Sequence, residues 1–184
     1  MATRNGFVAV LATLLLGLGL VACGGVLLLD SGGRDRRWAE MGADGDAAAW
    51  LAQRLVPWAR EQWVLGPASD VVVAGQSLGA MTALRAVLGH GDVVGGAVAQ
   101  SASLWQDDLA DLVEGRDLTG RRVHVEVGTQ EWVLHGPNRD LAGRLERAGA
   151  TVRYVEFDGG HDYACWRGGL ADAVARLLGP DPSA

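Results

Sequence analysis

The sequence predicts an α/β fold of three layers, in which a mostly parallel sheet with right-handed crossovers is covered by helices on both faces. Short, fully apolar runs alternate along the chain with longer segments of helical spacing, the order expected of such a sheet. The chain has 184 residues, 49% of them hydrophobic and 21% charged, enough to bury one core. No internal repeat or low-complexity linker divides it. We therefore expect one domain over residues 23–180 and a frayed tail at 181–184.

Five strands and five helices are expected from residue 25 onwards. The apolar or alternating runs of strand length are 25–30, 70–75, 93–102, 121–128 and 151–157. The segments with helical spacing are 46–63, 77–89, 106–115, 137–149 and 163–179. Acidic residues in its first turn support the third helix, while Pro137 opens the fourth and Gly149 closes it.

Charge and cysteine content argue against a nucleic-acid-binding protein and against a small disulfide-bonded one. The formal net charge is −6, and all 16 basic residues are arginines, so nothing in the chain predicts nucleic acid as a partner. The two cysteines, Cys23 and Cys165, lie far apart and in different contexts, which does not indicate a disulfide framework.

Residues 1–22 have the composition of a leader. One arginine precedes an uncharged apolar run that ends at Cys23, as in a secretory signal peptide. Leu20–Cys23, with the letters LVAC, resemble the lipobox of bacterial lipoproteins, whose cysteine becomes the lipidated first residue. The apolar character continues to Leu29, so an uncleaved membrane anchor is an alternative and a misassigned start codon a third. We expect a protein secreted or attached to the membrane in a bacterial cell envelope, or a cytoplasmic one if the start is misassigned.

A Gly-x-Ser-x-Gly sequence at 75–79 joins the expected strand 70–75 to the helix that follows. A nucleophilic serine on a sharp strand-to-helix turn needs glycines on both sides, because strand and helix cross closely there. The N-terminus of the helix also favours negative charge beside the serine. We therefore interpret Ser77 as a nucleophile and the amide of Leu78 as one oxyanion donor; the alternative is an unreactive serine in a glycine-rich turn.

A serine nucleophile needs a base, and His161 is the best placed of the four histidines. It follows the last expected strand through Asp-Gly-Gly, at the carboxyl edge of the sheet where such folds place their chemistry. The alternatives are a surface histidine at His90, a strand histidine at His124 and a loop histidine at His135.

An acid that orients the base is expected at the end of the preceding strand. Glu131 lies three residues beyond that strand, in the loop that follows it. The poorer candidates are inside the strand, inside the next helix, or beside the base: Glu126, Asp140, Asp158 and Asp162.

Three stretches together resemble the enterochelin esterase group of the α/β-hydrolase superfamily, which cleaves the trilactone of catecholate siderophores. They are VVVAGQSLGAMTALRAVL at 71–88, VAQSASLWQ at 98–106 and GGHDYACWRGGLADAV at 159–174. The Gly-Gly-His-Asp followed by Trp-Arg is much more specific than the serine motif, and the resemblance extends over about residues 26–178. It implies an α/β-hydrolase-like sheet with Ser77 as nucleophile, His161 as base and Glu131 in the acid loop.

The resemblance also implies the surroundings of the reaction. LLLDSGGRDRRWAE at 27–40 is similar to the first strand of the group and the turn after it, which places a second oxyanion donor near Gly32. Trp105 corresponds to part of an aromatic rim, and we expect it and Gln76 to contact the substrate. No metal or organic cofactor is implied.

One strand of the group is missing here. Between Trp38 and Trp50 the group has another strand and a loop, whereas this chain has only a few small and acidic residues, so the sheet is reduced in size. The first hypothesis is a serine esterase that acts on a small-molecule ester, such as a siderophore lactone, through an acyl-enzyme. The alternatives are a non-catalytic relative that binds such a ligand, and an acyltransferase.

Overall fold

The computed structural model describes residues 7–11, 25–30, 33–63 and 66–178. It confirms the α/β fold: six strands form one parallel sheet in the order β2-β1-β3-β4-β5-β6. The strands are β1 (Phe7–Leu11), β2 (Gly25–Leu28), β3 (Val71–Gln76), β4 (Gly96–Gln100), β5 (Arg122–Gly128) and β6 (Thr151–Phe157).

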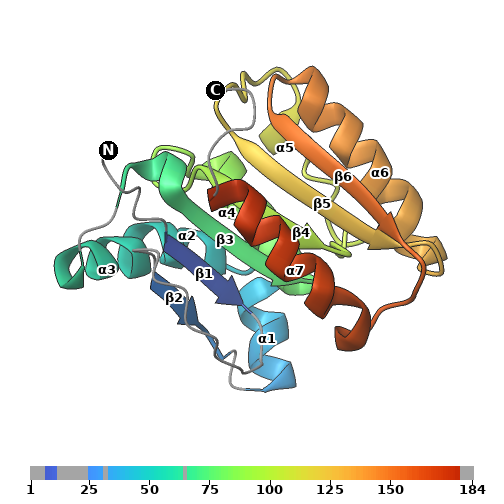
Figure 1. Ribbon diagram of the computed structural model, residues 1–184, viewed down its shortest axis with the longest axis horizontal. Coiled ribbons are helices and arrows are strands. Elements are labelled where there is room, and N and C mark those ends of the chain that lie inside the picture. The colour runs from blue at the N-terminus through green and yellow to red at the C-terminus, as the bar shows by residue number, and fades with distance from the viewer. Residues whose placement is uncertain (1–6, 12–24, 31–32, 64–65, 179–184) are drawn as a thin grey trace.

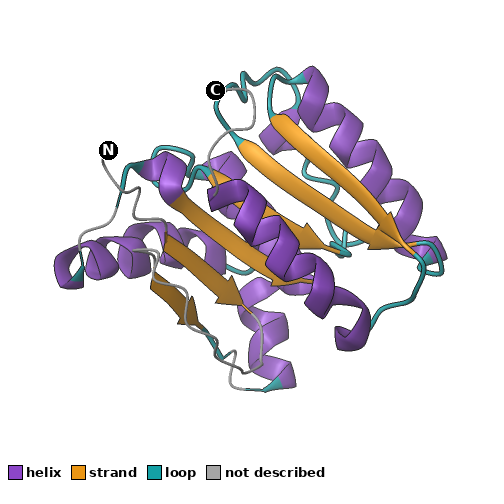
Figure 2. Cartoon of the chain, in the orientation of Figure 1, coloured by secondary structure: helices purple, strands orange, loops and turns teal. Residues whose placement is uncertain are grey.

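Helices cover both faces of this sheet, as Figures 1 and 2 show. Helix α7 lies across one face, against β3, β4 and β5, while α4 and α6 pack on the other, where α2 contacts α4. The helices are α1 (Arg34–Met41), α2 (Ala47–Trp50), α3 (Val56–Gln62), α4 (Leu78–Gly89), α5 (Ala110–Val113), α6 (Trp132–Arg147) and α7 (Tyr163–Leu178). A π-helical turn at Leu51–Leu55 joins α2 to α3, and a 3-10 turn at Ala68–Asp70 precedes β3.

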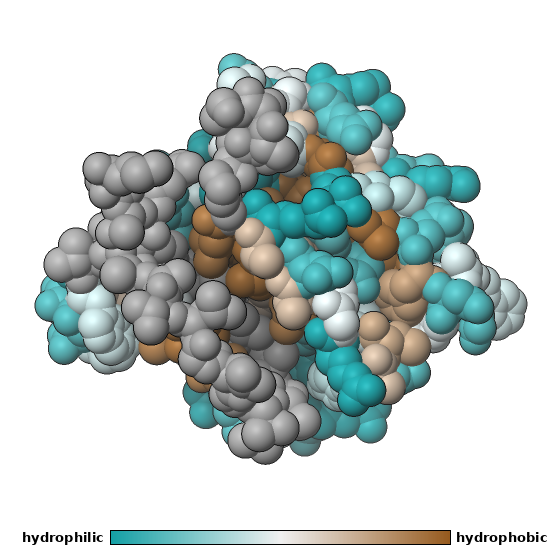
Figure 3. All heavy atoms as spheres, in the orientation of Figure 1, coloured by the Kyte–Doolittle hydropathy of each residue, from teal (hydrophilic) through white to brown (hydrophobic). Residues whose placement is uncertain are grey.

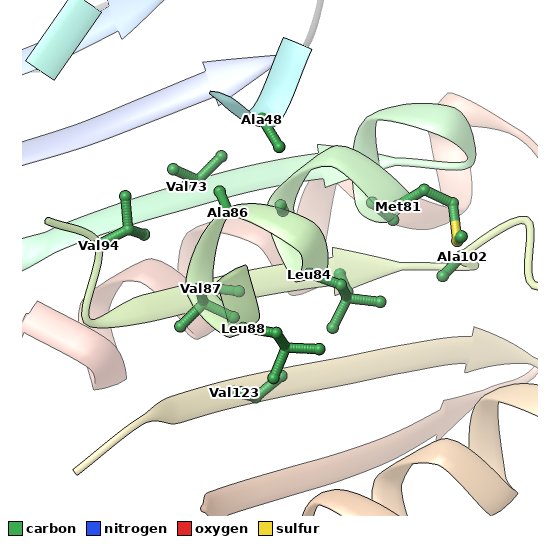
Figure 4. Packing of buried hydrophobic residues seen from close by; sticks show 14 of the residues in the cluster. Ala48, Val73, Met81, Leu84, Ala86, Val87, Leu88, Val94, Ala102 and Val123 are labelled. Carbon is green, nitrogen blue, oxygen red and sulfur yellow. The ribbon is translucent and has the colours of Figure 1, made fainter. Parts of the chain in front are cut away.

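The core explains why β3 reads as an unbroken apolar run. Val71 and Val73 face the large cluster beneath α4, whereas Val72 and Ala74 face a smaller cluster beneath α7. All four are fully buried, because a parallel strand with helices on both faces has no solvent side. Figure 4 shows Val73 packed beside residues of α4. On the α7 face, Figure 3 shows hydrophobic residues near the centre and hydrophilic residues around the rim.

The N-terminal strand β1 was not predicted from the sequence. Phe7–Leu11 lies between β2 and β3, paired in register with Gly25–Leu28 on one side and Val71–Gly75 on the other. The composition of residues 7–11 predicts a leader or an anchor, whereas the structure places them in the sheet. Residues 12–24, with the lipobox-like Leu20–Cys23 and the lipidation candidate Cys23, lie outside the described residues. Within the described part of the chain, no helix is both long and apolar enough to cross a membrane.

The region between Trp38 and Trp50 agrees with the sequence in lacking a strand. Residues 33–63 are described throughout, and they form helices and turns without any strand. Helix α1 lies where only the turn after the first strand was expected. The expected helix at 106–115 is reduced to the four residues of α5.

Helix α6 begins at Trp132, five residues before the expected start. Pro137 therefore lies inside the helix and not in its first turn, on the exposed face. A proline removes one backbone hydrogen bond there. The predicted start at Pro137 was wrong, because the helix continues through the proline from Trp132.

Candidate active site

Ser77 occupies a sharp turn between β3 and α4. Its backbone has φ 56° and ψ −115°, a combination that non-glycine residues rarely adopt. The turn depends on glycine, because a Cβ atom on Gly75 would lie 2.4 Å from the backbone carbonyl of Gly79. The Ser77 amide donates to the Gln100 carbonyl of β4 at 2.9 Å, which ties the turn to the neighbouring strand. The strand, turn and helix predicted around Ser77 are therefore all present.

The Ser77 hydroxyl lies 3.0 Å from the hydroxyl of Ser103, in the loop after β4. Among the described residues this is its one side-chain hydrogen bond, and none joins it to His161. Leu78 begins α4, so its amide is one of the unpaired N–H groups at the helix N-terminus. Ser77, Leu78, Ser103 and His161 all line one cavity. The nucleophile and base candidates thus share a cavity without being hydrogen-bonded.

His161 is held by Glu131, as the sequence analysis expected for a base and its orienting acid. The imidazole Nδ1 lies 2.5 Å from Glu131 Oε1. The Glu131 side chain is almost fully buried, whereas 42% of the His161 side chain is exposed toward the cavity opening. A histidine anchored through Nδ1 leaves its Nε2 free to exchange a proton with a substrate or a hydroxyl.

The Glu131 carboxylate accepts hydrogen bonds at both oxygens. Its Oε2 accepts from the Ser101 hydroxyl and from the Gly128 amide, each at 2.6 Å. Burial raises the pKa of this carboxyl, but the hydrogen bonds from His161, Ser101 and Gly128 outweigh burial and hold the pKa below its usual value. Glu131 is therefore an anion at neutral pH.

Sequence reasoning missed Ser101 and Trp166, which surround the His161–Glu131 pair. Trp166, in the first turn of α7, donates from its indole Nε1 to the Ser101 hydroxyl at 2.9 Å. Its ring packs edge-on against the His161 imidazole, with 4.7 Å between ring centres. The available signal for Ser101 was its place one residue after a strand, the same place that Ser77 has after β3.

The cavity has a volume of about 880 Å³ and an aromatic and partly cationic wall. Trp105 lies at its rim with 58% of its surface exposed, and its ring centre is 6.0 Å from that of Trp38. Arg34 and Arg37 also line it, and Arg37 donates to the Gln76 carbonyl at 3.1 Å. Such a wall suits a ligand that carries aromatic rings and negative charge.

Gln76 does not contact the cavity, contrary to expectation. Its side chain is buried and donates from Nε2 to Gln100 Oε1 of the paired strand β4 at 2.9 Å. The reason is its place in β3, where the alternation of side chains turns it, with Val72 and Ala74, to the face of the sheet that α7 covers. Gly32, the expected second oxyanion position, lies outside the described residues.

None of the alternative acids is hydrogen-bonded to His161, although Asp162 also lines the cavity. His124 is buried in β5 beside Glu126, and His135 lies in α6 and not in a loop. Asp162 accepts the amides of Ala164 and Cys165 at the start of α7. The remaining candidates, none hydrogen-bonded to His161, are His90, Asp140 and Asp158. In the described part of the chain, no group of three or more His, Cys, Asp or Glu side chains could hold a metal ion.

Comparison with known proteins identifies the family. Residues 29–177, most of the chain, match the family described as "Putative esterase". The chain belongs to this esterase family. The chain is 32% identical over 170 residues to the iron(III) enterobactin esterase of Escherichia coli K12; the alignment covers 84% of this chain and 41% of that protein. It is 29% identical over 175 residues to the iron(III) salmochelin esterase of E. coli CFT073, with 84% of this chain and 42% of that protein covered. The chain thus spans about two fifths of the length of these relatives.

Solved structures place the family member in the same fold as these enzymes. The enterobactin esterase of Shigella flexneri in the presence of enterobactin superposes with a TM-score of 0.81 at 25% identity, over 96% of this chain and 52% of that one. The structure of the same S. flexneri enzyme in the presence of 2,3-di-hydroxy-N-benzoyl-serine superposes with a TM-score of 0.71 at 28% identity, over 83% of this chain and 43% of that one. The resemblance to enterochelin esterases noted in the sequence is therefore confirmed at the level of family and fold.

Proposed function

We propose that this protein is a serine ester hydrolase. One observation carries the proposal: Ser77, on a strained turn at the N-terminus of α4, shares a cavity with a histidine oriented by a buried carboxylate. A nucleophile, a base and an orienting acid arranged in this way are the parts that ester hydrolysis needs. Membership of the esterase family supports the same reaction.

In the first half of the reaction, Ser77 Oγ attacks the carbonyl carbon of the ester. His161 Nε2 takes the hydroxyl proton, after Ser77 rotates about its Cα–Cβ bond away from Ser103 and toward the imidazole. Glu131 holds the other ring proton on Nδ1 and stabilises the imidazolium. The Leu78 amide stabilises the oxyanion, and collapse of the intermediate releases the alcohol, which takes its proton from His161.

In the second half, water hydrolyses the acyl-enzyme. His161 Nε2 takes a proton from a water molecule, and the oxygen of this water attacks the acyl carbonyl. Collapse returns the proton to Ser77 Oγ and releases the carboxylic acid. Because the cavity is open to solvent at His161, water has direct access to the base.

Labelling with a fluorophosphonate probe tests the proposal directly. We expect stoichiometric reaction at Ser77 and hydrolysis of short p-nitrophenyl esters, both abolished in Ser77→Ala. Removal of His161 should lower turnover by about 10⁴-fold or more. Ser69→Ala, at the opposite end of β3, is the matched control and should retain full activity. A folded wild-type protein that neither reacts nor hydrolyses would instead support a non-catalytic ligand-binding role.

We propose catecholate siderophore esters as the substrate class. The relatives named for enterobactin and salmochelin support this class, as do the aromatic rim and the two arginines of the cavity. Stacking of a catechol ring on Trp105 is worth about 0.5–1.5 kcal/mol beyond the burial of its surface. Arg34 offers the cationic group for an anionic ferric complex, since it is exposed at the cavity wall.

Comparing a metal-free catecholoyl-serine lactone with its ferric complex tests the substrate class. We expect both to be cleaved in preference to p-nitrophenyl acetate. Arg34→Ala should raise the KM for the ferric complex several-fold and leave the simple ester unaffected. Arg167→Ala, an exposed arginine outside the cavity wall, is the matched control. No turnover of either lactone by an active enzyme would leave a carboxylesterase of different specificity.

A further inference from the structure

A chain of hydrogen bonds leads from the cavity wall at Trp166 to the carboxylate that holds His161. It runs from the Trp166 indole to the Ser101 hydroxyl, and from there to Glu131 Oε2. We propose that Ser101 and Trp166 are positioning residues for the His161–Glu131 pair, an inference that rests on the function proposed above. Neither residue was a candidate from the sequence.

The direction of every proton in this chain is determined by chemistry. An indole Nε1–H can only donate, so the Ser101 oxygen must accept from Trp166. The single proton of that hydroxyl is then free to point to Glu131, and an ionised carboxylate can only accept it. Together with the Gly128 amide, this occupies Oε2 with two donors. Oε1 is thereby left to His161 Nδ1.

The backbone fixes where the Ser101 hydroxyl can go. Ser101 directly follows β4 and has a positive φ of 53°, as Ser77 after β3 has a φ of 56°. Its amide donates to the Glu126 carbonyl of β5 at 2.6 Å, so the turn is tied to the next strand. The residue is completely buried, and it does not line the cavity. Ser101 therefore reaches the reaction only through Glu131.

Trp166 holds the same pair from a second side. Its ring contacts the His161 imidazole edge-on, and its backbone carbonyl accepts from Gln100 Nε2 at 2.7 Å. His161, Glu131, Ser101 and Trp166 thus form a closed ring of contacts that joins β4, α6 and α7. A histidine that is otherwise exposed at a cavity mouth acquires a defined orientation from this ring.

Ser101→Ala tests the proposal, because it removes the hydroxyl and keeps the backbone of positive φ with a Cβ atom. We expect kcat/KM for a p-nitrophenyl ester to fall about 10- to 100-fold, as for loss of a hydrogen bond to a charged group, with KM within about twofold. The acid limb of the pH–rate profile should move to higher pH, because a carboxylate that accepts one bond fewer holds the imidazolium proton more strongly. The downfield proton resonance of the His161–Glu131 hydrogen bond should shift as well.

Trp166→Phe separates the indole N–H from the ring. It keeps an aromatic ring beside His161, so we expect a smaller loss of kcat/KM and a shift of the acid limb in the same direction. The indole N–H acts on Glu131 only through Ser101, and phenylalanine keeps the ring contact with His161. The double variant should therefore be no worse than Ser101→Ala by more than about twofold. Ser69→Ala again serves as the control for a serine replaced elsewhere.

Any of three results would overturn the proposal. The first is a Ser101→Ala variant whose pH–rate profile and His161–Glu131 proton resonance are unchanged, and the second is a Trp166→Phe variant with an unchanged pH–rate profile. The third is a double variant in which the two losses of kcat/KM multiply. If Ser101→Ala does not fold, the Trp166→Phe profile alone decides. Failure of the proposed function looks different, since wild-type protein would then show no hydrolysis that depends on Ser77. In that case the His161 resonance in wild type and the two variants still tests the positioning roles.

Discussion

Replacing Glu131 by glutamine changes one atom of the site and should disable it. In the wild type, Oε2 accepts two donors, the Ser101 hydroxyl and the Gly128 amide. The glutamine oxygen must occupy that place, because the amide nitrogen would present its own hydrogens to two donors there. The NH₂ group is then left facing His161 Nδ1, at the position where Oε1 lies 2.5 Å away.

This reversal changes the tautomer of the imidazole. The amide N–H donates to Nδ1, so the ring proton moves to Nε2 and the base can no longer accept the proton of Ser77. A buried carboxylate-to-amide change of this kind in a serine protease triad lowers kcat by about 10⁴-fold. At 1.36 kcal/mol for each factor of ten, this is roughly 5 kcal/mol of transition-state stabilisation. We expect a loss of about this size for Glu131→Gln.

The assay is hydrolysis of a p-nitrophenyl ester at pH 7, with Asp158→Asn as the matched control. Asp158 is an exposed acid near the base, and it bonds Gln130 rather than His161, so its variant should keep full activity. A folded Glu131→Gln protein within tenfold of the wild type would refute the orienting role of this carboxylate.

The free energy of unfolding should also depend on the Glu131 carboxylate and on its ionisation. The folded-state pKa of Glu131 is lowered from its ordinary value of 4.5, so its ionised form stabilises the fold at neutral pH. This contribution is lost as the pH falls below 4.5 and through the folded-state pKa. Urea unfolding should therefore show a deficit for Glu131→Gln of about 1–3 kcal/mol at pH 7, and a smaller one at pH 3. A deficit that is equal at both pH values would contradict this linkage.

Three further outcomes are expected. Gly75→Ala should lower the melting temperature and abolish activity, because its Cβ would lie 2.4 Å from the Gly79 backbone; an unchanged melting curve would contradict this. Ser103→Ala should leave fluorophosphonate labelling of Ser77 as fast as in wild type or faster, since the hydroxyl is freed for the base; labelling slowed more than tenfold would assign Ser103 to the reacting state. Removal of residues 1–22 takes away β1, so we expect a lower melting temperature; full stability of the shorter chain would favour the leader or anchor interpretation.

The parts of the site that depend on local sequence could be predicted. The serine turn has its glycines, strand and helix within 20 consecutive residues, and each of these signals refers to the same short piece of backbone. Glu131 and His161 were placed by their positions after successive parallel strands, because such strand ends meet at one edge of the sheet.

The parts of the fold and of the site that depend on distant contacts could not be predicted from the sequence. An uninterrupted apolar run such as Phe7–Leu11 has the composition of a leader, a membrane helix or a buried strand, and only its pairing partners distinguish them. Ser101 is one small residue among several, and its role depends on Glu131 and Trp166, which are 30 and 65 residues away. Gln76 was misplaced because adjacency to Ser77 in sequence does not determine the direction of its side chain.

The position of helix α7 determines how this protein should lose activity on heating. Its first turn supports His161 through Trp166, while its later residues, such as Ala173, cover the smaller of the two apolar clusters. A segment that buries little apolar surface opens at a lower cost than the whole domain. Detachment of this last helix would disorder the base while α4 and its large cluster stay intact. Turnover should therefore vanish at a temperature where circular dichroism still reports a largely native sheet. Thermal inactivation then reports the detachment of α7 and not the unfolding of the whole domain.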